Sequence, residues 1–462
     1  MTNSLTTEKS FGRTVLALVL PLAFQNLINV AVNAADVFML QMIGETSLSA
    51  ASMAGQVYFI MSLIFFGLTS GAAVLTAQYW GKRDTRTVER VLGMTVKFSV
   101  CISVIFFVAA FFFTRPVMGI LTSVPAVIDE AIPYLRIMAF TYPITAVSLI
   151  CLNILRSVEK VTISTIVYTV SLFANIGLNL VFIKGWLGFP AMGITGVAIA
   201  TLIARCIELV IALVYMRKNK VIRLRLKDVF KTNKLLMKDF VNFSIPVVVN
   251  ELLWGVAISV CATVIGHLGQ AAIAAQSVAT TVRQLAMVVV FGIANSTAII
   301  VGKEVGANRM ENAKLYAKKL MKFGFIAGIC GASLMLLLSP VVPKLMSNLS
   351  PEAASYLTFM IIALSIYVIC GSVSATGIVG VFRAGGDTKV GLILDVGTLW
   401  GIAIPAGCLA AFVFHWDVRV VFSLLICDEL LKSPIVLLRF KSMKWLHNVT
   451  REEVTEAVNS ER

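Results

Sequence analysis

The long uncharged stretches of this chain determine its fold class. Between Arg13 and Glu45 lie 31 residues with a single charged side chain, Asp36. As a helix rising about 1.5 Å per residue, such a run crosses roughly 30 Å of hydrocarbon. The run is too long for a cleavable signal peptide, contains an acid and leads directly into a second apolar run. We therefore expect it to be a transmembrane helix.

Similar apolar runs recur along the chain. Of its 462 residues 58% are apolar and 14% charged, whereas soluble domains average about 25% charged residues. We predict an all-α integral membrane protein with twelve transmembrane helices. The predicted spans are 14–40, 52–77, 92–114, 132–154, 162–183, 193–216, 241–266, 277–301, 320–343, 355–381, 388–413 and 418–438.

The basic residues are distributed unevenly between the predicted loops. Thirty of the 39 Lys and Arg residues fall on one side of the predicted membrane, nine of them within 217–238. This asymmetry is the positive-inside pattern, so we expect a multi-pass protein of the plasma (inner) membrane with both termini in the cytoplasm. The net charge of +15 thus reflects topology, and we expect no nucleic-acid partner.

The sequence also matches itself at an offset of 225 residues. Pro21 falls on Pro246, Gly44 on Gly269, and the match continues through Gly67 and Gly81 of the first half. Parallel repeats of this kind predict two pseudo-symmetric six-helix lobes. The predicted parts are an amino-terminal lobe (1–216), a basic cytoplasmic linker (217–240), a carboxy-terminal lobe (241–440) and a cytoplasmic tail (441–462).

The acid of the first predicted helix is the strongest candidate for chemistry. Asp36 has no basic residue nearby in sequence, and an ionised carboxylate within hydrocarbon is costly. In the fifth predicted helix Asn175 and Asn179 are one turn apart and share a face. Because the first and fifth helices run in the same direction, all three residues fall in the outer half of the membrane. One carboxylate with two amides suits a proton or a hard cation such as Na⁺. The alternative is an acid that reaches the outer interface.

A proline precedes this acid in the same helix. Pro21 lies about four turns before Asp36, and a proline inside a helix removes one hydrogen bond and favours a kink. A helix that bends and carries a titratable acid can exist in two states. We therefore predict that Pro21 is a hinge.

The second half contains further acids within predicted spans. Glu251 in the seventh helix and Asp395 in the eleventh are candidates for an ion site or for contact with a cationic substrate. The alternative for each is a structural acid with its own partner. Arg205–Glu208 and Asp428–Lys432 have the spacing of pairs that neutralise each other along one helix.

Other kinds of site have no support in the sequence. All eight cysteines fall inside apolar spans without the spacing of a disulfide framework or a zinc site. No GxxxxGK[ST] motif occurs and no catalytic groups are suitably spaced. We expect neither an enzyme nor a bound metal or cofactor, apart from Na⁺ as a coupling ion.

Several segments resemble the MATE (multidrug and toxic compound extrusion) family. They are PLAFQNLINVAVNAADVFML in the first helix, GETSLSAAS and AQYWGKRDTRTVERVLG around the second, NIGLNLVFIKGWLGFPAMGITGVAIAT across the fifth and sixth, and VFRAGGDTKVG after the tenth. The resemblance extends over about 14–440. An Asp in the first helix together with N-x3-N in the fifth is its most specific part.

The resemblance implies export of organic, often cationic, compounds coupled to H⁺ or Na⁺. It implies that Asp36 is the coupling acid and that Tyr142 and Thr201 join the polar cluster. Glu251 is similar to the seventh-helix acid of the NorM-like branch. That branch also has an acid in the tenth helix, whereas Ser372 aligns best here and 355–381 contains no acid. The resemblance therefore favours coupling in the amino-terminal lobe.

We accordingly predict an antiporter that works by alternating access, functions as a monomer and exports amphipathic drugs or toxins. A lipid-linked oligosaccharide flippase of the same superfamily is the main alternative, although such proteins often have extra helices or a cationic cavity. A membrane-embedded enzyme and a channel are the remaining alternatives. The sequence does not identify the substrate, because polyspecific pockets are shaped surfaces without a motif.

Overall fold

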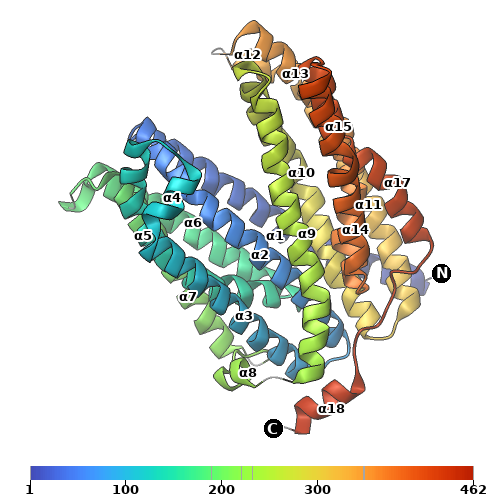
Figure 1. Cartoon of the computed structure of the whole chain (residues 1–462). Coiled ribbons are helices and arrows are strands. Elements are labelled where there is room, and N and C mark those ends of the chain that lie inside the picture. Colours follow the sequence, from blue (N-terminus) through green and yellow to red (C-terminus); the bar gives the residue numbers. More distant parts are fainter. Residues whose placement is uncertain (1, 189, 220, 232, 347–348, 461–462) are drawn as a thin grey trace. The chain divides into compact units, whose positions relative to one another are not determined.

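A computed structural model describes residues 2–188, 190–219, 221–231, 233–346 and 349–460, apart from the side chains of 2–10, 33, 34, 37, 187 and 226. Every regular element in these ranges is helical (Figure 1). The predicted linker 217–240 includes residues 220 and 232, which lie outside the described ranges. The helices are α1 (Thr2–Gln41), α2 (Glu45–Gly81), α3 (Thr85–Phe112), α4 (Thr114–Leu121), α5 (Pro125–Ser157), α6 (Val161–Lys184), η1 (Trp186–Gly188), α7 (Gly193–Lys218), α8 (Leu226–Phe230), α9 (Lys234–Gly266), α10 (Gln270–Gly306), α11 (Met310–Leu338), α12 (Val342–Leu345), α13 (Pro351–Ser374), η2 (Ala375–Phe382), α14 (Thr388–Thr398), η3 (Leu399–Ala403), α15 (Ile404–Cys408), η4 (Leu409–Val413), α16 (Val418–Leu425), α17 (Asp428–Lys441) and α18 (Glu452–Ser460).

Eleven helical stretches of the described chain are long and apolar enough to cross a membrane. The elements η2, η3 and η4 are π-helical segments within two of these spans, which run from Pro351 to Phe382 and from Thr388 to Val413. The span predicted at 418–438 is not one continuous helix, because α16 ends at Leu425 and α17 begins at Asp428. The charges at the start of α17 interrupt the apolar run and form contacts described below.

Backbone geometry repeats at the offset found in the sequence. The bounds of α10 equal those of α2 shifted by 225 residues. Gly44 and Gly269, which precede these helices, have φ of 153° and 123°, values that favour glycine. After the helices, Arg83 and Asn308 both adopt a left-handed conformation, with φ of 65° and 58°. The two halves therefore share local structure as well as sequence.

Contacts within the chain define two compact units. The amino-terminal unit is Phe24–Ser244 with Arg451–Arg462, and the carboxy-terminal unit is Met1–Ala23 with Ile245–Thr450. The division passes through α1 two residues after Pro21 and through α9 between Ser244 and Ile245, one residue before Pro246. Both prolines lie inside helices, so each helix that continues from one unit to the other contains a proline at the division.

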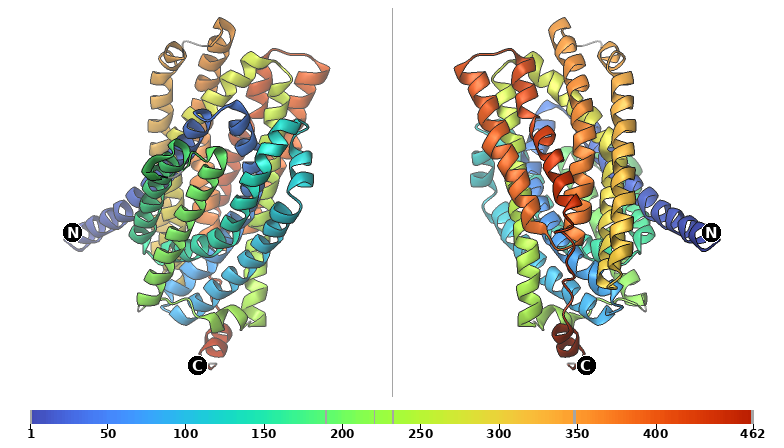
Figure 2. Two further views of the ribbon diagram at one scale, coloured as in Figure 1. Left: turned by 90° about the vertical axis from the view of Figure 1, so that its left-hand side faces the viewer. Right: turned by 90° about the vertical axis from the view of Figure 1, so that its right-hand side faces the viewer.

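The amino-terminal unit is built around α5, which packs against α2, α3 and α7. Its core contains Met61 and Phe65 of α2 and Leu135 and Tyr142 of α5, all at most 1% exposed. The short helix α18 packs against α3 (Figure 2). Close packing of large apolar side chains is the main stabilising contribution in this unit.

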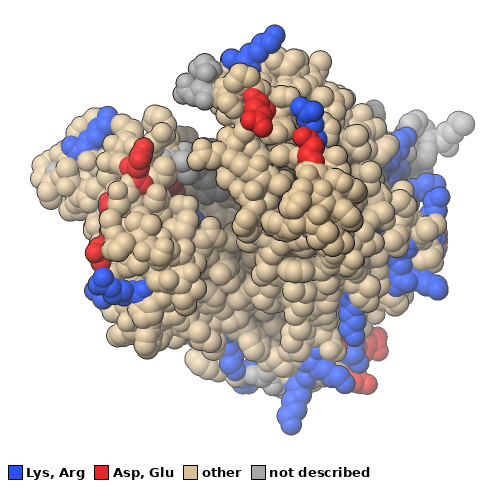
Figure 3. Space-filling view, turned by 45° about the horizontal axis from the view of Figure 1, so that its top comes forward, with Lys and Arg blue, Asp and Glu red and all other residues tan. Residues whose placement is uncertain are grey.

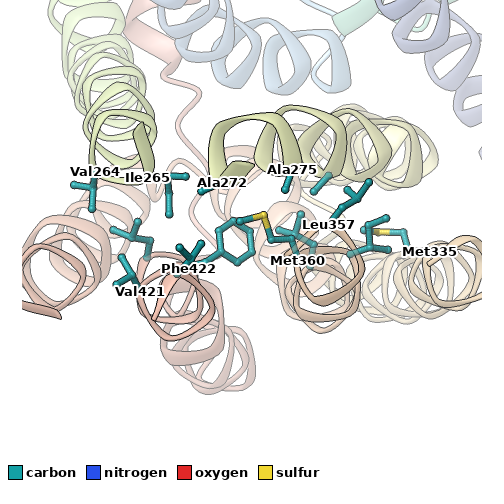
Figure 4. Close-up of a cluster of buried hydrophobic side chains, with 14 of the residues drawn as sticks. Val264, Ile265, Ala272, Ala275, Met335, Leu357, Met360, Val421 and Phe422 are labelled. Carbon is teal, nitrogen blue, oxygen red and sulfur yellow. The ribbon is translucent and has the colours of Figure 1, made fainter. Parts of the chain in front are cut away.

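The carboxy-terminal unit is built around α10, which packs against α11, α13 and η2. Figure 4 shows part of its core, where Leu357 and Met360 of α13 lie near Phe422 of α16. Ala272 and Ala275 contribute small side chains from α10. These small residues allow neighbouring helices to approach closely, as is common in membrane bundles.

Many large apolar side chains are exposed on the surface. On the face in Figure 3, side chains that are neither acidic nor basic occupy a broad central area. Many exposed residues are large and apolar, among them Ile105 at 67% and Phe173 at 68% exposure. A surface of this composition is suited to lipid and would aggregate in water.

Candidate functional site

The amino-terminal unit contains two polar contacts between α1 and α6. Near the start of α6, the Gln25 amide donates a hydrogen bond of 2.7 Å to the Thr165 hydroxyl and one of 3.3 Å to the Val161 carbonyl. Further along both helices, the Asn179 amide donates to Asp36. Because residue numbers rise in the same direction in both helices, α1 and α6 run parallel, as predicted.

The second of these contacts belongs to a chain of four side chains. Asn179 Nδ2 lies 3.1 Å from Asp36 Oδ1 and 3.2 Å from Asn175 Oδ1, and Asn175 Nδ2 donates to Thr201 Oγ1 over 3.1 Å. Asn175 and Asn179 are buried. The chain thus joins α1, α6 and α7, and it contains four of the residues predicted from the sequence.

This polar chain contains an unused acceptor. Asn179 Oδ1 is buried and has no hydrogen-bond partner among the described residues. The hydrogen bond that Asp36 accepts from Asn179 comes from an amide, which cannot neutralise a carboxylate. A proton or a small cation would therefore find one carboxylate and at least one free amide oxygen in the same cluster.

Tyr142 lies in the core of the same unit without joining this chain. Its ring packs near that of Tyr58, with centroids 6.3 Å apart. Its hydroxyl is buried and lacks a hydrogen-bond partner among the described residues. The structure therefore brings together Asp36, Asn175, Asn179 and Thr201, and the Tyr142 hydroxyl forms no hydrogen bond to them among the described side chains.

Glu251 of α9 forms a salt bridge in the carboxy-terminal unit. Its Oε1 accepts a hydrogen bond of 2.9 Å from Arg383, the residue that directly follows η2. Both side chains are largely buried, with exposures of 14% for Glu251 and 5% for Arg383. Arg383 lies two residues beyond the predicted span 355–381, and nothing in its local sequence predicts the contact with Glu251.

Asp395 of α14 contacts two other helices. Its Oδ2 accepts a hydrogen bond of 2.9 Å from Asn250 of α9, and its Oδ1 lies 2.7 Å from Lys432 Nζ of α17. Asn250 was not singled out in the sequence, although its place beside Glu251 in an apolar helix was a usable signal. The neighbouring acids Glu251 and Asp395 therefore both have basic partners within the unit.

The predicted pairing of Lys432 with Asp428 is only part of the arrangement. Lys432 Nζ lies 2.7 Å from Glu429 and 2.7 Å from Asp395, but 3.8 Å from Asp428. The i,i+4 pairing is incomplete because Glu429 is an i,i+3 partner on the same helix and Asp395 approaches from α14. By contrast, Arg205 and Glu208 form the predicted pair at 2.7 Å, and Glu208 also accepts from Ser148.

The tenth predicted helix contributes no acid, as its sequence indicates. Ser372 of α13 donates its hydroxyl hydrogen to the Ile369 carbonyl and is fully buried. One residue earlier, a Cβ atom added to Gly371 would lie 3.9 Å from the Glu429 carboxyl carbon. An acid from α17 thus lies beside this part of α13. Arg283 of α10 lies over the ring of Tyr367, at 5.2 Å from its centroid.

Metal chemistry has little support in this arrangement. Among the described residues, no group of three His, Cys, Asp or Glu side chains could hold a metal ion. The eight cysteines are all free. The polar side chains described above are instead suited to bind protons, monovalent cations or ammonium groups.

Comparisons with known proteins agree with this architecture. The MatE family model matches residues 21–181 and 246–409, one segment in each half. The transporter YisQ of Bacillus subtilis, described as uncharacterised, is 24% identical over 415 residues that cover 89% of this chain and 90% of YisQ. The probable multidrug resistance protein NorM of Mesorhizobium japonicum is 25% identical over 87% of each chain.

Solved structures share the fold. A MATE crystal structure in the bent conformation aligns with a TM-score of 0.84 at 18% identity, covering 97% of this chain and 96% of the other. The family match covers well over half of the chain, and the structural match extends over nearly all of it. The chain therefore belongs to the MatE family, whose members are multi-pass membrane transporters of multidrug efflux and not enzymes.

Proposed function

We propose that this chain exports organic cations and amphipathic compounds across the plasma membrane in exchange for H⁺ or Na⁺. Asp36 is the coupling acid, and Asn175, Asn179 and Thr201 complete its site. Transport proceeds by alternating access, in which the two units change their relative orientation.

The observation that carries this proposal is the hydrogen-bond chain from Asp36 through Asn179 and Asn175 to Thr201. An ionised Asp36 within the bilayer is costly, so it favours binding a proton or a cation. Either event changes the charge that Asn179 contacts. Because Asn179 belongs to α6 and Asp36 to α1, ion binding alters how firmly these two helices are held together.

The position of Pro21 supports a mechanical link. Gln25 and Asp36 attach the later part of α1 to α6, whereas residues up to Ala23 belong to the other unit. Pro21 is therefore close to the place where α1 passes from one unit to the next. A proline lacks the backbone N–H of a regular helix, so bending costs less there than elsewhere in α1.

We infer a topology of twelve membrane crossings, with α16 and α17 together forming the last. An even number of crossings, combined with the basic loops, places both termini in the cytoplasm. The Asp36 cluster lies within one chain, which supports a functional monomer. Each half of the chain then forms a six-helix lobe, with the basic segment 217–240 connecting the lobes on the cytoplasmic side.

The substrate class rests on two lines of support. NorM of Mesorhizobium japonicum and YoeA of Bacillus subtilis are both described as probable multidrug resistance proteins. The carboxy-terminal unit of this chain also contains several buried acids, which favour cationic compounds over anionic ones. These points favour drug export over transport of anionic lipid-linked sugars.

The proposal is tested with purified protein in proteoliposomes loaded with a cationic dye. We expect efflux driven by an imposed pH gradient or by an imposed Na⁺ gradient, applied separately. The variant Asp36→Asn loses gradient-driven efflux. The matched control is Asp129→Asn, which removes an exposed acid of the same unit that pairs with Arg115. Efflux from Asp36→Asn proteoliposomes at the wild-type rate would exclude the coupling role. Movement of a lipid-linked oligosaccharide without dye efflux would favour the flippase.

A further inference from the structure

The carboxy-terminal unit contains a second polar cluster that the coupling mechanism does not use. Its centre is the Lys432 ammonium of α17, which lies 2.7 Å from Asp395 and 2.7 Å from Glu429. Asn250 of α9 extends the cluster through its hydrogen bond to Asp395. Side chains of three helices, α9, α14 and α17, are therefore linked through Asp395 and Lys432.

Two buried oxygen atoms of this cluster lack partners. Asn250 is 5% exposed and its Oδ1 has no hydrogen-bond partner among the described residues. Glu429 is 8% exposed, and its Oε2 also has no hydrogen-bond partner in the described part of the chain. Both atoms belong to side chains already linked through Asp395 and Lys432. Buried acceptors without donors are costly, and both of these would accept an N–H hydrogen.

The cluster also has an excess of negative charge. Three acids, Asp395, Asp428 and Glu429, surround Lys432. A fourth, Glu251, directly follows Asn250 in α9. The nearby bases are Lys432, Arg383, which forms a salt bridge with Glu251, and Arg283, which lies over the ring of Tyr367. Even with both arginines counted, the acids outnumber the bases by one. One additional positive charge would balance the set.

The geometry favours an ammonium group over a metal ion as that charge. No three acids in the described chain are arranged to hold a metal ion. The Lys432 ammonium itself occupies the space between Asp395 and Glu429, so an ammonium group of this size fits there. The unpartnered oxygen atoms would accept hydrogen bonds from a protonated amine but not from a quaternary one.

A further acid, Asp428, is within reach of the Lys432 ammonium group. Asp428, one turn earlier on the same helix, lies 3.8 Å from Nζ, too far for a hydrogen bond and close enough to be reached by side-chain rotation. Asp395 is the most exposed of the acids around Lys432, with a side chain 17% exposed. An incoming amine would therefore meet Asp395 first.

We propose that Asp395, Glu429 and Asn250 form a recognition site for the protonated amino group of an exported compound, and that Lys432 is its built-in competitor. The substrate amine replaces the Lys432 ammonium between Asp395 and Glu429, and Lys432 turns to Asp428. When the substrate leaves, Lys432 returns and keeps the acids paired. This inference rests on the proposed export of organic cations and names the group by which such a compound is held.

Equilibrium binding to the purified full-length chain in detergent tests this site without any ion gradient. The probe is radiolabelled n-hexylammonium, with tetraethylammonium as a cation that lacks N–H donors. Removing the competitor by Lys432→Gln is expected to tighten hexylammonium binding by about tenfold or more, the usual scale of one charge-assisted hydrogen bond. Asp395→Asn and Glu429→Gln are expected to weaken it by a similar factor. Tetraethylammonium should compete poorly.

Three controls make the result decisive. Arg439→Gln removes a base of α17 that pairs with Asp387 and should leave binding unchanged. The double variant Lys432→Gln/Asp428→Asn keeps the net charge of the cluster and should also bind more tightly, even if the single variant folds poorly. Asp36→Asn should retain binding while losing driven transport, which separates this inference from the coupling proposal. Unchanged or weaker binding by the double variant, or competition by Na⁺ as strong as by amines, would overturn the proposal.

Discussion

The Asn179 amide donates a hydrogen bond of 3.1 Å to the Asp36 carboxylate, so that α6 contacts the one acid of the predicted span 14–40. The same amide nitrogen donates to Asn175, which in turn reaches Thr201 of α7. The occupancy of one carboxylate thereby affects the contacts of three helices. This relationship leads to several predictions about the cluster and about the helices that connect the two units.

Asn179, in the middle of the hydrogen-bond chain, should affect ion coupling more than Thr201 at its end. Asn179→Ala removes the contacts to both Asp36 and Asn175, whereas Thr201→Val removes only the last link. We expect the concentration of coupling ion needed for half-maximal efflux to rise about tenfold or more for Asn179→Ala, because a hydrogen bond to a charged group contributes about 1.5–3 kcal/mol. Thr201→Val should change it much less. Equal effects in a titration of efflux against ion concentration would contradict this order.

Pro21 should control the rate of transport without controlling ion binding. Pro21→Ala restores a helix hydrogen bond and makes α1 stiffer. We expect efflux to slow several-fold while the ion concentration for half-maximal efflux stays the same. Pro133→Ala is the control, since Pro133 lies inside α5 and away from the division between units. If Pro21→Ala transports at the wild-type rate, the hinge assignment is wrong.

The Glu251–Arg383 salt bridge should behave as a coupled structural pair. Removing one partner leaves a buried charge without compensation, which typically costs about 3–5 kcal/mol. We expect Glu251→Gln and Arg383→Gln each to lower the free energy of unfolding in detergent, and the double variant to recover much of the loss. Additive losses in a double-mutant cycle would show that the two residues act independently.

The carboxy-terminal helix α18 should stay docked over a wide pH range. Arg451 forms two hydrogen bonds to Asp239, at 2.8 and 2.9 Å, and its backbone N–H donates to the Tyr79 hydroxyl. The hydrogen bonds to Asp239 raise the pKa of Arg451 above its usual value. A raised pKa means that the contribution of the pair is present below the usual arginine pKa and is lost only as pH rises beyond the raised value.

Hydrogen exchange measures this docking directly. Protection factors of 452–460 should not change between pH ~6 and ~9, since Arg451 stays charged throughout. Arg451→Gln should lower them modestly, because Arg451 is 49% exposed and such pairs contribute at most about 1 kcal/mol. A loss of protection by the wild-type chain within this pH range would contradict the assignment.

Much of the fold follows from patterns that are local in sequence. The uncharged runs identified the membrane helices, and the 225-residue offset correctly related Gly44 to Gly269. Asn175 and Asn179 could be assigned to one face because their spacing is one helical turn, and the parallel course of α1 and α6 made contact with Asp36 reasonable. The break between Leu425 and Asp428, inside the predicted span 418–438, was not predicted.

Contacts between distant helices could not be predicted in the same way. Lys432 was paired with Asp428 because the i,i+4 rule considers only one helix. Its contact with Asp395, 37 residues earlier on α14, could not follow from spacing. Its contact with Glu429 is an i,i+3 pair on the same helix that the i,i+4 pairing overlooked. Arg383 lies just beyond the predicted span 355–381, yet its side chain contacts Glu251. The partner of a buried charge depends on which helices pack together, and no local spacing specifies that.

The central claim is that Asp36 is the group through which the ion gradient drives export. It is tested most directly by imposing a gradient of the organic cation across proteoliposomes and recording the counter-flow of H⁺ or Na⁺. The wild-type chain should move one of these ions against the substrate flow. Asp36→Asn should show no counter-flow while Asp129→Asn behaves as wild type. Counter-flow by Asp36→Asn at the wild-type rate would contradict the account.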